Sequence, residues 1–257
     1  FPGTNCEVDS ERAFRKAGGE PEIFVLRNQT EHQLKESIGE LAKKIKQSQI
    51  VMLPGGFSGG DEPDGSAKFI TAVFRNPAIS DEVMELLNNR DGLMLGICNG
   101  FQALIKLGLV PFGEIRPMTK DSPTLTYNKI GRHVSGLVRT RIASVKSPWM
   151  TGVEVGDIHT IPVSHGEGRF IVGRDLLAEL AEKGQIATQY VDLDDRPTMD
   201  LPYNPNYSDG AVEGITSPDG RILGKMGHSE RIGKNLYKNV PGDYDQQIFA
   251  SGVHYYK

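Results

Sequence analysis

The sequence predicts an α/β protein with an open, mostly parallel sheet, helices on both faces and a smaller antiparallel β portion. Two observations carry this prediction. In the first half of the chain, short apolar runs alternate with amphipathic segments, as strands and crossover helices do in parallel sheets. In the middle of the chain, apolar and polar residues alternate one by one, which is typical of antiparallel strands.

The elements of the first half follow from local patterns. Residues 29–49 give the clearest helical signal, because apolar residues recur there at helical spacing on a charged background. Glycine and proline mark the ends: Gly18-Gly19 closes the first helix, and Pro77 is expected to break a later one. The expected strands are 21–26, 50–53 and 92–97, and the expected helices are 9–17, 29–49, 66–89 and 99–107.

The second half combines antiparallel strands with loops. The clearest signal is Ser217-Pro218-Asp219-Gly220, a strong turn between two apolar runs that predicts a hairpin. No internal repeat, low-complexity tract or flexible linker interrupts the chain, so we expect one domain over residues 1–257. The expected strands are 132–144, 160–172, 212–215 and 221–226, with helices at 176–183 and 246–253 and a Pro/Asn-rich loop at 202–210.

Composition narrows the class of protein. The 257 residues are 38% hydrophobic and 24% charged, as in ordinary soluble domains. A net charge of -4 gives no signature of nucleic-acid binding, and no apolar window approaches the roughly 18–20 residues that cross a bilayer. Two cysteines are too few for a disulfide framework, which favours a reducing cytoplasm. Residues 1–6 have no initiator Met and are typical of a loop just after a strand, so we expect that the chain is cut from a longer polypeptide or lacks its first residues.

Residues 93–108, LMLGICNGFQALIKLG, predict a strand, a tight turn and a helix, with Cys98 on the turn. This is the order of a nucleophile elbow, here with cysteine in place of serine. Gly96 and Gly100 lack the β-carbons that would clash in so sharp a turn. Amide N–H groups at the start of the following helix favour a thiolate. The alternative is a buried structural cysteine, the commoner fate of a lone thiol.

A nucleophilic cysteine needs a base, and His228 in KMGHSER is the best candidate. In an extended backbone, Glu230 would project to the same side and orient the imidazole. The alternative is a casual His–Glu pair on a surface loop. His165, in SHGEGR, is a rival that we assign to substrate contact together with Gly166, because the flanking glycines suggest a close backbone approach. The alternative for this segment is a plain turn at the end of a strand. No role is expected for the remaining histidines, which are His32, His133, His159 and His254.

The segment LPGGFSGGD is glycine-rich but is not a phosphate-binding loop, because no Gly-Lys-Ser/Thr follows. It could aim the backbone N–H of Gly56, or of Gly55, at a developing oxyanion, paired with the N–H of Asn99. The alternative is an ordinary glycine turn. Cys6 is expected to be a structural or binding-loop thiol. No metal is expected, since the two cysteines are far apart in sequence and no histidine pair has ligand spacing.

Together these residues resemble the class I (triad) glutamine amidotransferases. GICNGFQ matches that family's G-x-C-x-G-x-Q pattern, and His228-Ser229-Glu230 matches its late His-x-Glu. Five segments further resemble the glutaminase part of phosphoribosylformylglycinamidine synthase, most closely the carboxy-terminal domain of its large single-chain form. Two departures from that subfamily are GGFSGGDEPDG in place of GGFSYGD, and MGHSER in place of Met-Pro-His-Pro-Glu-Arg. The five segments are PGTNCEVD, PGGFSGGDE, GICNGFQ, SHGEGRF and GHSER.

The resemblance implies a flavodoxin-like fold and a glutaminase reaction. Cys98 would attack the side-chain amide of glutamine, and His228, oriented by Glu230, would protonate the departing ammonia. By the same resemblance, Gln102 would help bind glutamine. The remaining implied pocket residues are Gly55, His165 and Gly166.

The resemblance also implies a partner. Ammonia would pass to a synthase domain or subunit that holds ATP and Mg and converts formylglycinamide ribonucleotide to formylglycinamidine ribonucleotide, while this domain needs no cofactor. Three alternatives stay open: a triad glutaminase that serves another synthase, a catalytically silent interaction domain of the same fold, and a cysteine hydrolase of another class such as a peptidase.

Overall fold

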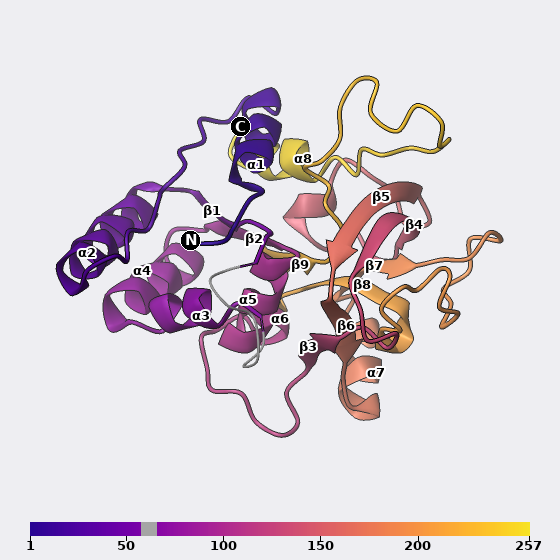
Figure 1. Cartoon of the computed structure of the whole chain (residues 1–257), viewed down its shortest axis with the longest axis horizontal. Helices are drawn as coiled ribbons and strands as arrows, with labels where there is room; N and C mark the ends of the chain where they lie inside the picture. Colours follow the sequence, from indigo (N-terminus) through magenta and orange to yellow (C-terminus); the bar gives the residue numbers. More distant parts are fainter. Residues whose placement is uncertain (58–65) are drawn as a thin grey trace.

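The computed structural model describes residues 1–57 and 66–257, and its centre is a seven-stranded sheet in the order β1-β2-β9-β8-β7-β4-β5 (Figure 1). The first three strands in this order pair in parallel, and the remaining pairings are antiparallel. A separate two-stranded antiparallel sheet joins β3 to β6. The strands are β1 Ile50–Leu53, β2 Leu93–Ile97, β3 Thr124–Tyr127, β4 Val134–Ile142, β5 Ile158–His165, β6 Glu167–Ile171, β7 Ile186–Tyr190, β8 Val212–Thr216 and β9 Ile222–Lys225.

Helices cover both faces of the parallel strands, which confirms the predicted α/β class. Figure 1 shows α1 and α8 above β1, β2 and β9, and α3 to α6 below them. Phe14 of α1 contacts Phe249 of α8 on the upper side, and Phe101 of α5 packs directly against Gly224 of β9 on the lower side. The helices are α1 Glu7–Lys16, α2 Glu31–Gln47, α3 Lys68–Phe74, α4 Pro77–Asn88, α5 Asn99–Leu107, α6 Leu109–Phe112, α7 Arg174–Glu182 and α8 Ile248–His254, with short 3-10 turns at Pro148–Met150 and Asp209–Ala211.

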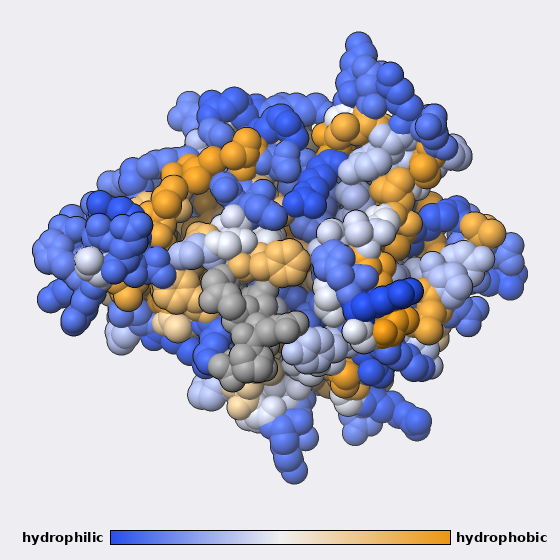
Figure 2. All heavy atoms as spheres, in the orientation of Figure 1, coloured by the Kyte–Doolittle hydropathy of each residue, from blue (hydrophilic) through white to orange (hydrophobic). Residues whose placement is uncertain are grey.

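Local signals set most element ends correctly. The predicted break near Pro77 is confirmed: α3 ends at Phe74, and α4 begins with Pro77 after Asn76, whose side chain accepts a hydrogen bond from the amide of Ala78 at 3.0 Å. The hairpin of β8 and β9 is confirmed as well. Helix α2 buries only Ser37 and Ile45, and Figure 2 shows hydrophilic residues over the end of the molecule where α2 lies.

Two expected strands differ from the structure. Residues 21–26 form no strand, and among the described residues no β-strand pairs with this segment. Leu26 is buried, but Val25 is 69% exposed, so the outward side chains have no neighbouring strand to pack against. Residues 160–172 are two strands in different sheets. Strand β5 ends at His165 and β6 begins at Glu167, so the chain changes sheets at Gly166.

The parallel part of the sheet decides where the functional residues gather. Strands β1, β2 and β9 run side by side in the same direction, so their carboxyl ends share one edge. Gly55 and Gly56 follow β1, Cys98 follows β2, and His228 follows β9 closely. No helix among the described residues has the length and apolar character needed to cross a bilayer. The segment SGGDEPDG, which contains the first departure from the subfamily motif, lies outside the described residues.

Candidate active site

Cys98 occupies a strained turn between β2 and α5. Its backbone has φ 54° and ψ −107°, a region that residues with a β-carbon rarely adopt and that costs on the order of 1–3 kcal/mol. Glycines make the turn possible, because a β-carbon at Gly100 would lie 1.9 Å from the carbonyl oxygen of Leu53. The amide of Cys98 donates to the carbonyl of Lys225 at 2.8 Å and so ties the turn to β9. The elbow geometry predicted from the sequence is therefore present.

His228 and Glu230 form a buried pair, as their spacing predicts. Nδ1 of His228 lies 2.6 Å from Oε1 of Glu230, and both side chains are almost fully buried. Burial by itself would lower the pKa of His228, but the Glu230 carboxylate, helped by the sulfurs of Cys6 and Cys98, raises this pKa well above its ordinary value. The carboxylate therefore stabilises the imidazolium that forms when His228 takes up a proton.

Gly55 is the point at which these groups meet. A β-carbon placed on Gly55 would lie 2.8 Å from Cε1 of His228, 3.1 Å from the sulfur of Cys6 and 3.3 Å from Cβ of Cys98. All three residues therefore surround one backbone position at the end of β1. A side chain larger than hydrogen at residue 55 would displace at least one of them.

The chain beside Gly55 is held by the amino-terminal segment. Thr4 and Gly56 form an antiparallel bridge, in which the amide of Asn5 donates to the carbonyl of Gly55 at 3.2 Å and the amide of Phe57 donates to the carbonyl of Gly3 at 2.8 Å. These two hydrogen bonds do not use the amide of Gly56. Its φ of +126° and the close approach of Thr4 and Asn5 both require glycine.

Gln102 and Asn99 lie on the buried face of α5 and contact each other. The side-chain amide of Asn99 donates to Oε1 of Gln102 at 3.0 Å, and the side-chain amide of Gln102 donates to the carbonyl of Glu167. Both polar ends of Gln102 thus have protein partners. The side chain ties the elbow helix to the turn at residues 165–167.

His165 and Gly166 lie on that turn, close to Cys98 and His228. The sulfur of Cys98 lies 3.8 Å from the carbonyl oxygen of Ser164. Burial, followed by repulsion from His228, lowers the pKa of His165 to about 3, so this imidazole is neutral. Neither of its ring nitrogens has a hydrogen-bond partner among the described residues. His133, for which no role was expected, contacts the same turn through Ser164 Oγ at 3.0 Å.

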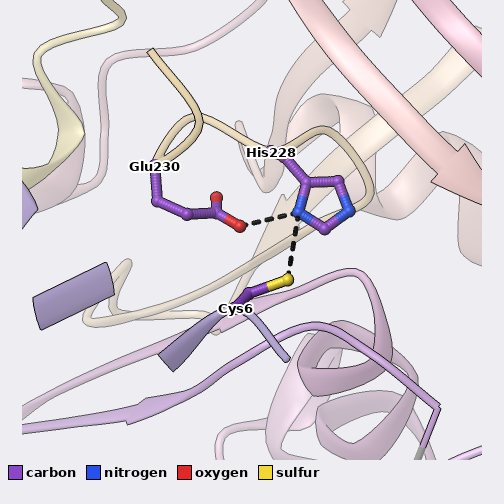
Figure 3. A group of neighbouring side chains, drawn as sticks. All are labelled: Cys6, His228 and Glu230. Carbon is purple, nitrogen blue, oxygen red and sulfur yellow. Dashed lines mark hydrogen bonds and ion pairs between the residues drawn. The ribbon is translucent and has the colours of Figure 1, made fainter. Parts of the chain in front are cut away.

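Cys6 lies in the same cluster as Cys98 and His228, a position that the sequence did not predict. Its sulfur is fully buried and lies 3.8 Å from Nδ1 of His228 (Figure 3). The same sulfur accepts a hydrogen bond from Nη2 of Arg231 at 3.0 Å. The pairing of residues 3–5 with 55–57 carries Cys6 there. The signal in the sequence was the segment PGTNCEVD, whose resemblance to the family included this cysteine.

A buried ion pair supports the loop that carries His228. Nζ of Lys225 lies 3.2 Å from Oε1 of Glu213, and both side chains are fully buried. Glu213 accepts from the amide of Gly227 at 2.6 Å, while Lys225 donates to the carbonyl of Gly227 at 2.9 Å and to Ser229 Oγ at 3.0 Å. The amide and the carbonyl of Gly227, one residue before His228, are therefore both held by hydrogen bonds with this ion pair.

Comparisons with known proteins agree with this geometry. The sequence family described as the CobB/CobQ-like glutamine amidotransferase domain matches residues 1–256. Among similar curated proteins, the phosphoribosylformylglycinamidine synthase subunit PurQ of Salinibacter ruber is 31% identical, with 98% of this chain and 92% of the relative covered. The subunit of the same name from Alkaliphilus metalliredigens is 29% identical, with 99% of this chain and 93% of the relative covered.

Solved structures show the same fold. The structure of PurLQS from Thermotoga maritima matches 100% of this chain and 96% of the solved chain, with a TM-score of 0.70 and 25% identity. A GMP synthase subunit protein from Thermoplasma acidophilum matches at a TM-score of 0.55 and 13% identity over 99% of this chain and 89% of the solved one, which is a likeness of fold alone. The chain therefore belongs to the family of CobB/CobQ-like glutamine amidotransferase domains.

Proposed function

We propose that this chain is the glutaminase component of phosphoribosylformylglycinamidine synthase. It hydrolyses glutamine to glutamate and ammonia, and the ammonia serves the ATP-dependent conversion of formylglycinamide ribonucleotide to formylglycinamidine ribonucleotide in purine biosynthesis. The observation that carries the glutaminase is the meeting of the strained Cys98 with the buried His228–Glu230 pair around Gly55. The choice of synthase is supported by the relatives named PurQ, which align with nearly the whole chain.

The proposed reaction runs through a thioester. Cys98 gives its proton to His228 and attacks the side-chain carbonyl carbon of glutamine, and the imidazolium then protonates the departing nitrogen, which leaves as ammonia. His228, again neutral, takes a proton from water, and the resulting hydroxide displaces the Cys98 sulfur to give glutamate. The proton on His228 then returns to that sulfur. Glu230 holds Nδ1 of His228, so that Nε2 is the nitrogen that exchanges protons.

Backbone amides are proposed to stabilise the oxyanion of both tetrahedral intermediates. The N–H of Gly56, or of Gly55, would lie on one side, and the N–H of Asn99 at the start of α5 on the other. The strain at Cys98 supports this role, because it places the sulfur at the amino-terminal end of α5, where amide groups favour negative charge.

The remaining pocket residues are proposed to shape the glutamine site. Gln102, whose polar atoms are both engaged, would hold the turn of His165 and Gly166 against α5 rather than bind substrate by itself. His165 is buried and neutral beside His228, so it would contact glutamine without competing for the proton.

The partner is proposed to be a synthase domain or subunit that accepts ammonia and carries ATP and Mg, while this chain acts without a cofactor. The PurLQS structure and the subunit names of the relatives support such an assembly. We also propose that residues 1–257 act as one domain, which is supported by one main apolar cluster shared by both halves. A reducing cytoplasmic location is supported by two buried free thiols.

The test uses the chain together with its synthase. Cys98→Ala and His228→Ala should each abolish glutamine-dependent synthesis, while ammonia-dependent synthesis should survive, because the synthase site is untouched. Glutamine hydrolysis retained in Cys98→Ala would refute the assignment of the nucleophile. Failure of the active complex to use formylglycinamide ribonucleotide would show that the chain serves another synthase.

A further inference from the structure

Cys6, His228 and Glu230 present three metal-ligating atoms to one another. The sulfur, the imidazole nitrogen and a carboxylate oxygen all lie within 4.8 Å of one another, and all three residues are buried. Figure 3 shows the sulfur and the carboxylate both directed at Nδ1 of His228. Cys6 precedes α1, while the other two follow β9, so the fold makes this cluster from distant segments.

The spacing suits zinc. Tetrahedral zinc with Zn–S of about 2.3 Å and Zn–N of about 2.0 Å separates the sulfur and nitrogen ligands by roughly 3.5 Å. The sulfur of Cys6 lies 3.8 Å from Nδ1 of His228. Oε1 of Glu230 lies 2.6 Å from that nitrogen, so this carboxylate would withdraw by less than about 1 Å to reach ligand spacing.

The cluster also contains one acceptor oxygen that the described protein does not satisfy. Oε2 of Glu230 is buried and has no hydrogen-bond partner among the described residues. A buried carboxylate oxygen normally has a partner, and a metal ion could be one. The sulfur of Cys6 accepts a hydrogen bond from the guanidinium of Arg231 at 3.0 Å, which helps to hold this ligand atom in place.

A pocket reaches His228, one member of the cluster. A pocket of about 230 Å³ is lined by His228, Arg231 and Tyr237 among other residues. On the other side, Gly55 places no side chain between the sulfur of Cys6 and His228. Sulfur, imidazole and carboxylate together are a ligand set typical of zinc rather than of magnesium or calcium.

We propose that Cys6, His228 and Glu230 form an inhibitory Zn²⁺ site. This inference rests on the proposed function, because it deepens the regulation of the same site. Zinc would replace the proton of the Cys6 thiol, which passes to solvent. It would bind Nδ1 of His228, whose proton moves to Nε2, so the hydrogen bond to Glu230 breaks. With zinc on Nδ1, Nε2 carries the remaining proton and cannot accept one from Cys98, so glutamine hydrolysis stops.

The first experiment measures zinc binding without using activity. Cys98→Ala removes the competing thiol, and a chromophoric chelator then competes with this variant for Zn²⁺. We expect one zinc per chain in Cys98→Ala, and a loss of affinity of at least about 100-fold when Cys6→Ser is added, since even an outer partner of a metal ligand contributes about 10- to 100-fold. Equal affinity in both variants, or no binding in Cys98→Ala, would overturn the proposal.

Two controls keep this result specific. His32→Ala removes an exposed His–Glu pair on α2, with 3.4 Å between Nδ1 of His32 and Oε2 of Glu36, and should leave the zinc affinity unchanged. A second measurement leaves residue 6 intact: Zn²⁺ should slow the alkylation of Cys6 by iodoacetamide in Cys98→Ala. An alkylation rate that zinc does not change would contradict the site even if Cys6→Ser misfolded.

The activity arm separates this inference from the proposed function. Zn²⁺ should inhibit glutamine hydrolysis by the unaltered chain, EDTA should reverse the inhibition, and Cys6→Ser should need at least about tenfold more zinc for half inhibition, because it loses one ligand of three. Equal sensitivity of Cys6→Ser would place the zinc on Cys98 and His228 instead. If the chain hydrolysed no glutamine, the proposed function would fail, while the chelator experiment would still decide the zinc site.

Discussion

Replacing Lys225 by methionine tests how the His228 loop is held. Lys225 and Glu213 lie 3.2 Å apart and are both fully buried, so Lys225→Met leaves a carboxylate in the core without its counter-ion. Breaking a buried ion pair on one side costs about 3–5 kcal/mol of unfolding free energy. The change also removes the hydrogen bonds from Nζ to the carbonyl of Gly227 and to Ser229, so the loop before His228 loosens.

The assay is urea unfolding with linear extrapolation, combined with glutaminase kinetics. Lys225→Met should lose about 3–5 kcal/mol of stability and should lower kcat more than it raises KM, because His228 loses its position and glutamine keeps its contacts. Adding Glu213→Gln should restore part of the stability, since no charge is then left unpaired.

A matched control makes the same substitution at the surface. Lys183→Met breaks an exposed pair with Glu179 in α7, at 2.5 Å, and should cost no more than about 0.5 kcal/mol. If Lys225→Met lost less than about 1 kcal/mol, or if the double variant were less stable than the single one, the idea of a clamped loop would be wrong.

Four further predictions follow from the site. Glu230→Ala should lower kcat less than His228→Ala, because the base remains and only its orientation is lost; equal losses in glutaminase assays would contradict this. Gly55→Ala should lower kcat by about 100-fold, since its β-carbon would lie 2.8 Å from Cε1 of His228. The control Gly39→Ala, in open space on α2, should leave kcat unchanged. A fully active Gly55→Ala would show that residue 55 is not crowded. Cys98→Gly should be more stable to urea than Cys98→Ala by about 1 kcal/mol, because glycine relieves the positive φ; equal stabilities would argue against strain. The pKa of His165 is lowered to about 3, so below pH 6.5 the unfolded chain binds a proton that the folded chain does not. As the pH is lowered from 6.5 towards 3, the free energy of unfolding should therefore fall by up to about 1.4 kcal/mol per pH unit. His165→Gln should flatten this slope, and an unchanged slope would refute the reasoning.

The sequence predicted the parts of the site that depend on local patterns. The elbow at Cys98 follows from glycines on either side of the cysteine between two apolar runs, and the His228–Glu230 contact follows from a spacing of two residues. Alternating strands and helices predicted a parallel sheet in the first half of the chain. The structure confirms that β1 and β2 pair in parallel, which brings Gly55 and Cys98 to one edge of the sheet.

The site residues that the sequence did not predict are brought together by pairing between segments that are distant in the sequence. Cys6 reaches His228 only because residues 3–5 pair with 55–57, and nothing local in the sequence marks that pairing. Lys225 and Glu213 meet because β8 and β9 pair in one register, while each residue alone reads as an ordinary charge at a strand. The expected strand at 21–26 was wrong for the same reason: its composition favours a strand, but tertiary structure supplies no partner. The expectation that no metal is bound stays a prediction. It considered the two cysteines alone, whereas the fold brings Cys6 together with His228 and Glu230.

The most direct test of the central claim is to find which sulfur reacts with a glutamine analogue. Both cysteines lie beside His228, so a diazo-ketone analogue of glutamine, followed by peptide mass spectrometry, separates them. We predict an adduct on Cys98 alone, suppressed by glutamine and formed far more slowly in His228→Ala. An adduct on Cys6, or labelling of Cys98 that is indifferent to His228, would contradict the assignment.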